Sequence, residues 1–316
     1  MAKTALVLGA TGGIGGEIAR QLVAAGWRVR GLRRKAGGPD QSGIEWMTGD
    51  AMQRADVLRA AEGAEVIVHA VNPPGYQRWS ELVLPMLDNT LAAAAVNQAR
   101  VVLPGTVYNF GPDQWAHILE GAPQNPQTRK GKIRAEMERR LRQAASAGTP
   151  VLIVRFGDFF GPQVGNSWFA QGLVKPGKAV TSIANPARPG AGHQWAYVPD
   201  AARTVLRLLA QDNLPPFANY HFGGHWDADG TQMATAIQRV VQQQTGQAPA
   251  IKRFPWWLVT LASPVVTVFR ELREMRYLWQ QSVHMDNRQL LAQLGSEPHT
   301  PLDEAVRATL KGLKCL

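Results

Sequence analysis

The glycine-rich turn near the N-terminus constrains the fold of this chain more than any other feature. An apolar run at residues 4–8 leads into Gly9-Ala10-Thr11-Gly12-Gly13-Ile14-Gly15, and helical spacing follows over residues 14–25. Glycines allow a tight turn whose backbone N–H groups approach a pyrophosphate, and the helix N-terminus adds partial positive charge beside that anion. A turn without a ligand is the alternative. We predict that a dinucleotide contacts Gly9, Thr11, Gly12, Gly13, Ile14 and Gly15.

Strand-like and helix-like segments alternate through the first half of the chain. Strand-like runs occupy residues 4–8, 27–32, 44–47, 66–71, 101–103 and 151–156, and helical spacing marks residues 14–25, 82–98 and 132–147. Such alternation produces right-handed crossovers and a mostly parallel sheet with helices on both faces, which binds ligands beyond the carboxyl ends of its strands. We therefore predict an α/β fold with a Rossmann-type, doubly wound parallel sheet.

The domain organisation follows from length and from a change of pattern. The chain has 316 residues, of which 45% are apolar and 18% charged, so it can bury a sizeable core. A domain holds about 150 residues, which suggests two parts. Gly, Pro and Trp become frequent over residues 161–194. We expect a dinucleotide-binding domain at residues 1–155 plus about 190–216, and a smaller C-terminal substrate-capping region at residues 156–189 and 217–316.

The end of the second strand bears on the choice of dinucleotide. NAD-binding sheets place an acidic residue there for the ribose hydroxyls, whereas this chain has Arg33, Arg34 and Lys35. Guanidinium groups donate in pairs to phosphate, so we expect NADP in preference to NAD, with Arg33 and Arg34 on the 2′-phosphate. A solvated basic loop is the alternative. Asp50 and Ala51, after the third strand, are expected beside the adenine, with a helix cap as the competing role of Asp50.

Further motifs follow the glycine turn in order along the chain. They are Val66-Ile67-Val68-His69-Ala70, Thr106-Val107-Tyr108-Asn109-Phe110-Gly111-Pro112, Arg155-Phe156-Gly157-Asp158-Phe159-Phe160-Gly161-Pro162, Trp195-Ala196-Tyr197-Val198-Pro199-Asp200-Ala201-Ala202 and His221-Phe222-Gly223-Gly224. Over nearly its whole length the chain thus resembles the extended or atypical short-chain dehydrogenase/reductases, the superfamily of NAD-dependent epimerases and dehydratases. The resemblance implies cofactor contacts at Ala70, Val71, Asn72, Lys132 and Phe156.

The chain departs from this family at the groups that handle protons. The family uses Tyr-x-x-x-Lys on a helix, where the Lys binds the nicotinamide ribose and lowers the pKa of the Tyr. Here the resemblance assigns Lys132 to the Lys position and Thr128 to the Tyr position, and an alkyl hydroxyl is a far weaker acid than a phenol. The family also has a Ser where this chain has Pro104, so that Thr106 is the nearest hydroxyl.

Three explanations of the missing tyrosine stay open. Tyr108, just past the fifth strand, is the first candidate for a substitute phenol, although a packing role is the alternative. Protonation can instead come from water or from His193. Finally, the protein can bind the cofactor without turnover. His69 lies in an apolar strand, and we expect it to be a hydrogen-bonded core residue.

Composition limits the partners and the compartment. The formal net charge of +10 permits a phosphate-bearing ligand, but basic residues are not interleaved with aromatic ones, so we expect no nucleic acid. The single cysteine, Cys315, excludes an internal disulfide or a cysteine metal cluster and favours a reducing, cytoplasmic compartment. Residues 256–269 carry no charge, yet they are too few to span a membrane. We expect a buried or lid element there, with surface contact to a membrane as the alternative.

Three functions are compatible with these observations. The first is an NADP-dependent oxidoreductase, of the carbonyl or enone reductase type, that acts on a small and fairly apolar substrate. The second is an NADP-binding regulatory or scaffolding protein with little turnover. The third is a sugar-nucleotide epimerase or dehydratase, which needs the missing proton shuttle most. All three bind no metal, and a homodimer is compatible with each.

Overall fold

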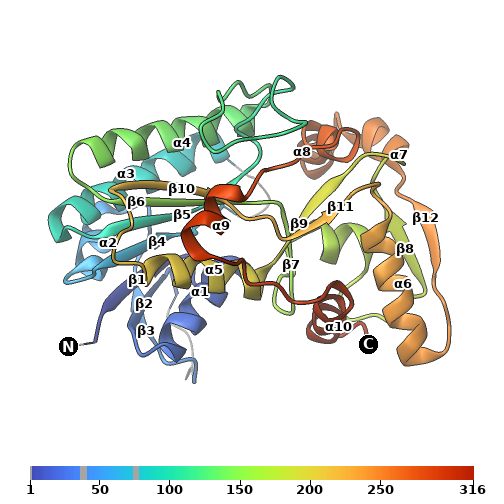
Figure 1. Ribbon diagram of the computed structural model, residues 1–316, viewed down its shortest axis with the longest axis horizontal. Coiled ribbons are helices and arrows are strands. Elements are labelled where there is room, and N and C mark those ends of the chain that lie inside the picture. Colours follow the sequence, from blue (N-terminus) through green and yellow to red (C-terminus); the bar gives the residue numbers. More distant parts are fainter. Residues whose placement is uncertain (1, 36–40, 74–77) are drawn as a thin grey trace.

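A parallel sheet of seven strands forms the centre of the larger part of the protein (Figure 1). The structure, a computed structural model, describes residues 2–35, 41–73 and 78–316. The predicted doubly wound α/β fold is confirmed. The strands lie in the order β10 (Phe217–His221), β6 (Val151–Phe156), β5 (Arg100–Thr106), β4 (Val66–His69), β1 (Thr4–Leu8), β2 (Arg28–Arg33) and β3 (Ile44–Thr48).

Helices cover both faces of this sheet because its strands are apolar on both sides. Along β1, Ala5 and Val7 pack into one core cluster, whereas Leu6 and Leu8 pack into another, as the two-residue period of a strand requires. The first face is covered by α1 (Gly13–Ala24) and α5 (Val198–Leu209), and the second by α2 (Arg54–Ala61), α3 (Trp79–Asn97) and α4 (Arg129–Ser146).

The smaller region lies at the carboxyl ends of the sheet strands and has a core of its own. Its strands form two small sheets, β7 (Asp158–Phe160) with β9 (His193–Tyr197) and β11 (His225–Asp227), and β8 (Ser182–Asn185) with β12 (Ala250–Arg253). Its helical elements are η2 (Phe169–Leu173), α6 (Gln232–Thr245), α7 (Trp256–Ala262), α8 (Thr267–Glu274), η3 (Arg276–Trp279) and α10 (Leu302–Gly312).

Two elements of the C-terminal half return to the larger part. Strand β10, which we expected in the substrate-capping region, pairs in parallel with β6 at the edge of the main sheet. Helix α9 (Arg288–Leu294) follows it there, because Leu290 and Leu294 pack into the same core cluster as α1 and α5. The chain therefore passes between the two regions more often than the predicted domain boundaries indicate.

A buried ion pair fixes α4 against the sheet. Arg155 of β6 is fully buried and donates to both carboxylate oxygens of Glu138 on α4, at 2.9 and 2.6 Å. His221 of β10 lies 2.9 Å from the same guanidinium, and burial, followed by the charge of Arg155, lowers the pKa of His221 to about 3. The neutral ring can therefore accept a hydrogen bond from Arg155. This network fixes the rotation of α4 about its own axis. It therefore determines which side chains of α4 point toward the strand ends.

The uncharged segment 256–269 forms α7 and the beginning of α8. Val259 and Ser263 are buried, whereas Trp257, Leu261 and Val265 are exposed. The expectation of a buried element is therefore wrong for the outer side of this segment. In the part of the chain that the structure describes, no helix is both long and apolar enough to cross a membrane.

Candidate functional site

The glycine turn joins β1 to α1 at the carboxyl edge of the sheet. Gly9 has φ +90°, and a Cβ there would lie 2.5 Å from the carbonyl oxygen of Ala70, so both conformation and space require glycine. Gly12 precedes α1, which begins without a side-chain cap. Among described atoms, a Cβ at Gly12 would meet only the carbonyl oxygen of Gly9, at 3.3 Å. The space beside Gly12 is thus open to an anion such as a pyrophosphate, whereas a Cβ at Gly13 would meet the Val164 side chain at 3.2 Å.

The predicted adenosine contacts lie at the ends of the next two strands on the same edge. Arg33 ends β2, and its guanidinium lies over the ring of Trp46 at 4.7 Å from the ring centroid. Arg34 is exposed beside it. Asp50 accepts a hydrogen bond from the backbone N–H of Met52 at 2.9 Å, so its carboxylate shapes the turn after β3. A helix cap is not its role, because α2 is preceded by Gln53.

A cavity of about 500 Å³ continues from this edge between the sheet and the smaller region. The strand ends supply its floor with Gly105, Thr106 and Phe156. The smaller region supplies aromatic and aliphatic walls with Trp168, Phe254, Phe269, Leu272, Leu278 and Val283. Polar groups that line it include Asn72, Tyr108, Arg134, Asp158, Asn166, Ser167, Gln171, His193 and Gln194. An apolar cavity with convergent polar groups is typical of a ligand site.

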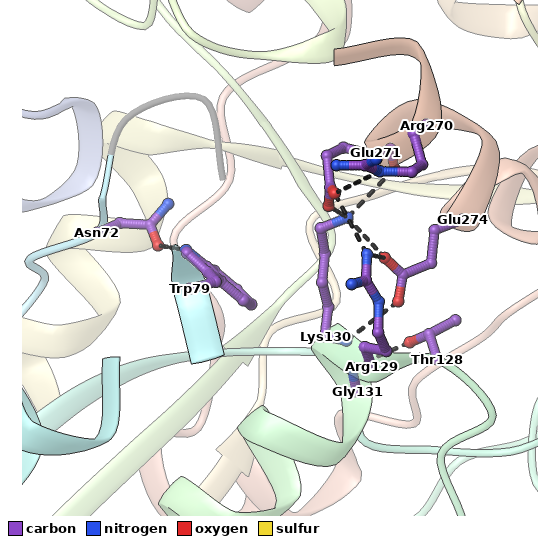
Figure 2. A network of polar contacts seen from close by, with 9 residues as sticks. All are labelled: Asn72, Trp79, Thr128, Arg129, Lys130, Gly131, Arg270, Glu271 and Glu274. Atoms are coloured by element: carbon purple, nitrogen blue, oxygen red, sulfur yellow. Dashed lines mark hydrogen bonds and ion pairs between the residues drawn. The ribbon is translucent and has the colours of Figure 1, made fainter. Parts of the chain in front are cut away.

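One wall of the cavity is built from Asn72, Trp79 and Arg134. The carboxamide oxygen of Asn72 accepts a hydrogen bond from the indole N–H of Trp79 at 2.8 Å, as Figure 2 shows. The guanidinium of Arg134 lies over the Trp79 ring, 5.1 Å from its centroid. This contact orients a cation of α4 beside Thr106 and Phe156 at the strand ends. The family resemblance implied that Asn72 contacts the cofactor, whereas no sequence motif indicated Arg134.

The rotation of α4 requires a correction to the expected places of Thr128 and Lys132. Thr128 precedes α4 and accepts a hydrogen bond from the backbone N–H of Gly131 at 2.9 Å, so it caps the helix. Lys132 is exposed and lines a separate hollow on the outer side of α4. Residues two apart on a helix point roughly 200° apart. The inward pair with the spacing of four residues is therefore Lys130 and Arg134.

Lys130 is held in an ion-pair network with α8 (Figure 2). Its ammonium lies 2.5 Å from a carboxylate oxygen of Glu271 and 3.0 Å from one of Glu274, and the Lys130 side chain is only 3% exposed. Burial tends to raise the pKa of Glu274, but the hydrogen bond and charge of Lys130 outweigh it, so this pKa is lowered. Lys130 therefore binds α8 to the start of α4 rather than lining the cavity. We call these three residues the Lys130 clamp.

The remaining hydroxyl candidates, Thr106 and Tyr108, lie together in the cavity lining. The hydroxyl oxygen of Thr106 accepts a hydrogen bond from the backbone N–H of Tyr108 at 2.9 Å, which fixes the turn after β5. His69 is buried, and its Nδ1 lies 2.8 Å from the hydroxyl of Thr90. Burial is the main reason that the pKa of His69 is lowered to about 3. The expected core role of His69 is confirmed.

His193 also lines the cavity, together with an acid that the sequence interpretation missed. Its Nε2 lies 2.8 Å from a carboxylate oxygen of Asp158, and its Nδ1 lies 3.1 Å from the carbonyl oxygen of Leu278. The ring stacks on Trp279 with 3.8 Å between ring centroids. Both ring nitrogens are thus engaged, so His193 is not free to exchange a proton with a ligand unless Asp158 moves. The sequence does contain a signal for Asp158, because an acidic residue stands two positions after the sixth predicted strand.

Comparison with known proteins places this geometry in a family. The sequence profile described as "NAD dependent epimerase/dehydratase family" matches residues 5–223. The chain belongs to this family. The resemblance stated from the motifs is therefore confirmed, and the match covers the strand ends and the cavity floor. A sequence search of curated proteins gives no significant match.

Solved structures of similar fold cover nearly the full length of this family member. MoeE5 in complex with UDP-glucuronic acid and NAD is 16% identical over 98% of both chains, with a TM-score of 0.74. The Bordetella bronchiseptica enzyme WbmH in complex with NAD+ is 20% identical over 99% of both chains, with a TM-score of 0.72. UDP-glucuronic acid 4-epimerase from Bacillus cereus, in complex with UDP-glucuronic acid and NAD, is 14% identical over 98% of this chain and 99% of that one, with a TM-score of 0.72.

These structures correct the expected cofactor. All three hold NAD or NAD+, which contradicts our preference for NADP. The physical reason lies at the end of β2, where the sequence shows Arg33 and Arg34 but not what they contact. The guanidinium of Arg33 is already stacked on Trp46, so a basic residue at this strand end is not by itself a phosphate ligand.

Proposed function

We propose that the protein is an NAD-dependent enzyme of the sugar-nucleotide epimerase or dehydratase type. The observation that carries this proposal is the position of the cavity, which begins at the carboxyl ends of β5 and β6 and extends under the smaller region. The similar structures include two complexes with UDP-glucuronic acid, and they match this chain through both regions. This support favours the sugar-nucleotide reading over the carbonyl or enone reductase that we placed first.

The cofactor residues in this proposal follow the edge of the sheet. The glycine turn from Gly9 to Gly15 would hold the pyrophosphate at the start of α1, because the helix begins without a side-chain cap and the space beside Gly12 is open. Asp50 follows β3 at the same edge, and we expect the adenosine to end beside it. Arg134 lines the cavity with Thr106 and Phe156, and its N–H groups would donate to a ribose hydroxyl. Bound NAD would supply a hydride acceptor and donor. The protein's part is to align a carbon–oxygen centre of the substrate and to handle its proton.

Tyr108 is our proposed proton-handling residue. Its side chain lines the cavity beside Thr106, and a phenol is a far stronger acid than the Thr106 hydroxyl. Thr128 caps α4, and both ring nitrogens of His193 are engaged. Of the candidates named, Tyr108 is the one that combines a phenol with a place in the cavity lining. Thr106 can donate a hydrogen bond to the same substrate oxygen, because its hydroxyl oxygen already accepts from the backbone.

The aromatic walls suit the flat groups of a sugar nucleotide. Trp168, Phe254 and Phe269 provide ring surfaces for a base or for the apolar face of a sugar. Asn166, Ser167 and Gln171 add hydrogen-bonding groups along the same side. Asp158 adds a carboxyl group to this cavity, and His193 lies within hydrogen-bond distance of it.

The test combines binding with turnover. We expect NAD to raise the melting temperature more than NADP at equal concentration, and UDP-glucuronic acid to raise it further. Incubation with NAD and UDP-glucose or UDP-glucuronic acid should yield an epimerised or dehydrated nucleotide sugar, followed by NMR. Stabilisation by NAD with no stabilisation by any nucleotide sugar would contradict the substrate class. No stabilisation by NAD would contradict the cofactor site.

A second function is favoured by one observation. The inward position on α4 that precedes Arg134 by four residues holds Lys130, whose ammonium is bound by Glu271 and Glu274 and does not line the cavity. A protein that binds NAD and a ligand with little turnover fits this loss of a proton shuttle. A substrate deuterated at the reacting carbon separates the two functions. Transfer of deuterium to the cofactor shows an enzyme, whereas tight binding of both ligands without transfer shows a binding protein.

A further inference from the structure

Most of the exposed large apolar side chains belong to one stretch of the chain. Among the described residues, ten large apolar side chains are exposed, and six of them belong to a single stretch near α7. We call these six the α7 surface: Ile251, Trp257, Leu258, Leu261, Val265 and Val266. Scattered exposed apolar residues are ordinary, whereas a contiguous set marks an interaction site.

The α7 surface is one side of an amphipathic element. Trp257, Leu261 and Val265 are 67%, 73% and 86% exposed, and each is four residues from the next. Val259, on the opposite side of α7, is buried. Figure 1 shows α7 and α8 at the upper right edge of the molecule, on the opposite side from strands β1 to β3. Helices α7 and α8 form a hairpin at the periphery, and these apolar side chains project outward from it.

The exposed charges next to the α7 surface are positive, whereas the two acids of α8, Glu271 and Glu274, contact Lys130. Residues 230–270 contain no Asp or Glu, whereas Lys252 and Arg253 precede α7 and Arg270 lies on α8. Lys252 and Arg253 are exposed, and neither forms an ion pair with any residue that the structure describes. The nearest carboxylate to Arg270 belongs to Glu271, at 3.9 Å, and Glu271 is bound more closely by Lys130. Lys252 and Arg253 thus border the apolar side chains with positive charge that no described carboxylate compensates, and Arg270 adds a charge that Glu271 compensates in part.

We propose that the α7 surface binds the surface of an anionic phospholipid membrane. A tryptophan and aliphatic side chains on one side of a short helix enter the boundary between headgroups and acyl chains. Flanking lysine and arginine side chains reach the lipid phosphates, and the attraction to anionic lipid grows with their number. The helix is too short to span the bilayer, so the contact is peripheral. This proposal is independent of the reaction, because the α7 surface faces away from the cavity.

The membrane would lie directly behind one wall of the cavity. Phe254 precedes α7, and Phe269 and Leu272 belong to α8, and all three line the cavity from the inner side of the same hairpin. The hairpin is thus a thin partition with an apolar ligand site on one side and the α7 surface on the other.

Vesicle flotation tests the proposal with the whole 316-residue chain. We expect the wild type to float with vesicles of equal parts phosphatidylcholine and phosphatidylglycerol, and to be released by high salt. Trp257→Ser with Leu261→Ser should lower the vesicle-bound fraction by about tenfold or more, because two large apolar side chains are lost. Lys252→Gln with Arg253→Gln should weaken binding to these vesicles by about tenfold. Val96→Ser is the matched control, since Val96 is 72% exposed on α3.

A site-specific probe adds a second measurement. Cys315 is the only cysteine and is buried, so Leu261→Cys in a Cys315→Ser background takes a single environment-sensitive label. The label should shift to the blue on phosphatidylglycerol vesicles, whereas the same label at Val96→Cys should not. Absence of wild-type binding, or equal binding by the Trp257→Ser, Leu261→Ser variant, would overturn the proposal. So would sedimentation that shows the wild type as a dimer and this folded variant as a monomer, because the surface would then pair with a second copy.

Discussion

Replacement of Lys130 by methionine tests whether the Lys130 clamp holds α8 over the cavity. The ammonium of Lys130 contacts Glu271 at 2.5 Å and Glu274 at 3.0 Å, and α8 supplies Phe269 and Leu272 to the cavity. Lys130→Met keeps the apolar stem and removes the charge. The two carboxylates would then face each other without their shared cation, which favours separation of α8 from α4.

The magnitude follows from burial and from a neighbouring arginine. Removal of one partner of a buried ion pair costs about 3–5 kcal/mol, because an uncompensated charge stays behind. The side chains of Glu271 and Glu274 are 11% and 15% exposed, and Arg129 lies 3.3 Å from one and 3.7 Å from the other. Partial solvation and Arg129 offset part of the loss. We therefore expect Lys130→Met to destabilise the docked α8 by about 2–3 kcal/mol.

The pH dependence has a defined sign. The pKa of Glu274 lies below 4.5 in the folded protein, so its contribution is full above the unfolded pKa and is lost as the pH falls through the folded value. In Lys130→Met the side-chain hydrogen bond and the charge that lower the pKa of Glu274 are gone, while burial still tends to raise it, so the variant loses less stability as the pH falls. The difference between wild type and Lys130→Met is therefore largest near neutral pH and decreases toward about pH 4.

Hydrogen exchange of the α8 amides is the primary assay, because the helix can separate without global unfolding. Urea unfolding supplies the global free energy. Lys132→Met is the matched control, since Lys132 is exposed on the same helix. Addition of Glu271→Gln and Glu274→Gln to Lys130→Met should restore most of the protection, because no buried charge then stays unpaired. Unchanged α8 exchange in Lys130→Met would refute the reasoning.

Three further predictions concern the cavity and the turn. Arg134→Met should weaken NAD binding by about tenfold or more, whereas Lys132→Met should leave it within about threefold; equal effects in calorimetry would contradict the assigned rotation of α4. Tyr108→Phe should lower turnover by about 100-fold or more while NAD affinity is retained, so a small effect on the rate would exclude its proton role. Gly12→Val should abolish NAD-induced stabilisation while the chain still melts cooperatively, and continued stabilisation would show that the turn holds no phosphate.

The fold was predictable because its signals are local. Apolar residues recur every 2 residues in a strand and about every 3.6 residues in a helix, and these periods do not depend on how the loops connect the elements. The position of β10 was not predictable in this way. Its sequence, Phe217–His221, resembles any short strand, and only its pairing with β6 shows that it extends the main sheet. Pairing partners depend on distant residues, which a local pattern does not contain.

The site was only partly predictable because motif spacing does not give helix rotation. A four-residue spacing fits Thr128 with Lys132 as well as Lys130 with Arg134. The apolar residues Met137 and Leu141 could have decided between them, since steps of three or four residues back from Leu141 reach Arg134 and Lys130. The structure confirms this phase, because Met137 and Leu141 are buried.

The hairpin of α7 and α8 connects features that the sequence presents separately. The Lys130 clamp holds its inner helix to α4, Phe269 and Leu272 close the cavity from its inner side, and the α7 surface covers its outer side. Trp256, at the start of α7, donates a hydrogen bond to the carbonyl oxygen of Pro186, whereas α8 is held to α4 by the ion pairs of the Lys130 clamp. A ligand in the cavity and a contact on the α7 surface therefore both affect the position of the hairpin, which these ion pairs hold to α4. For this reason ligand binding in the cavity should protect the α8 amides in wild type more than in Lys130→Met, where the helix is no longer held in one position.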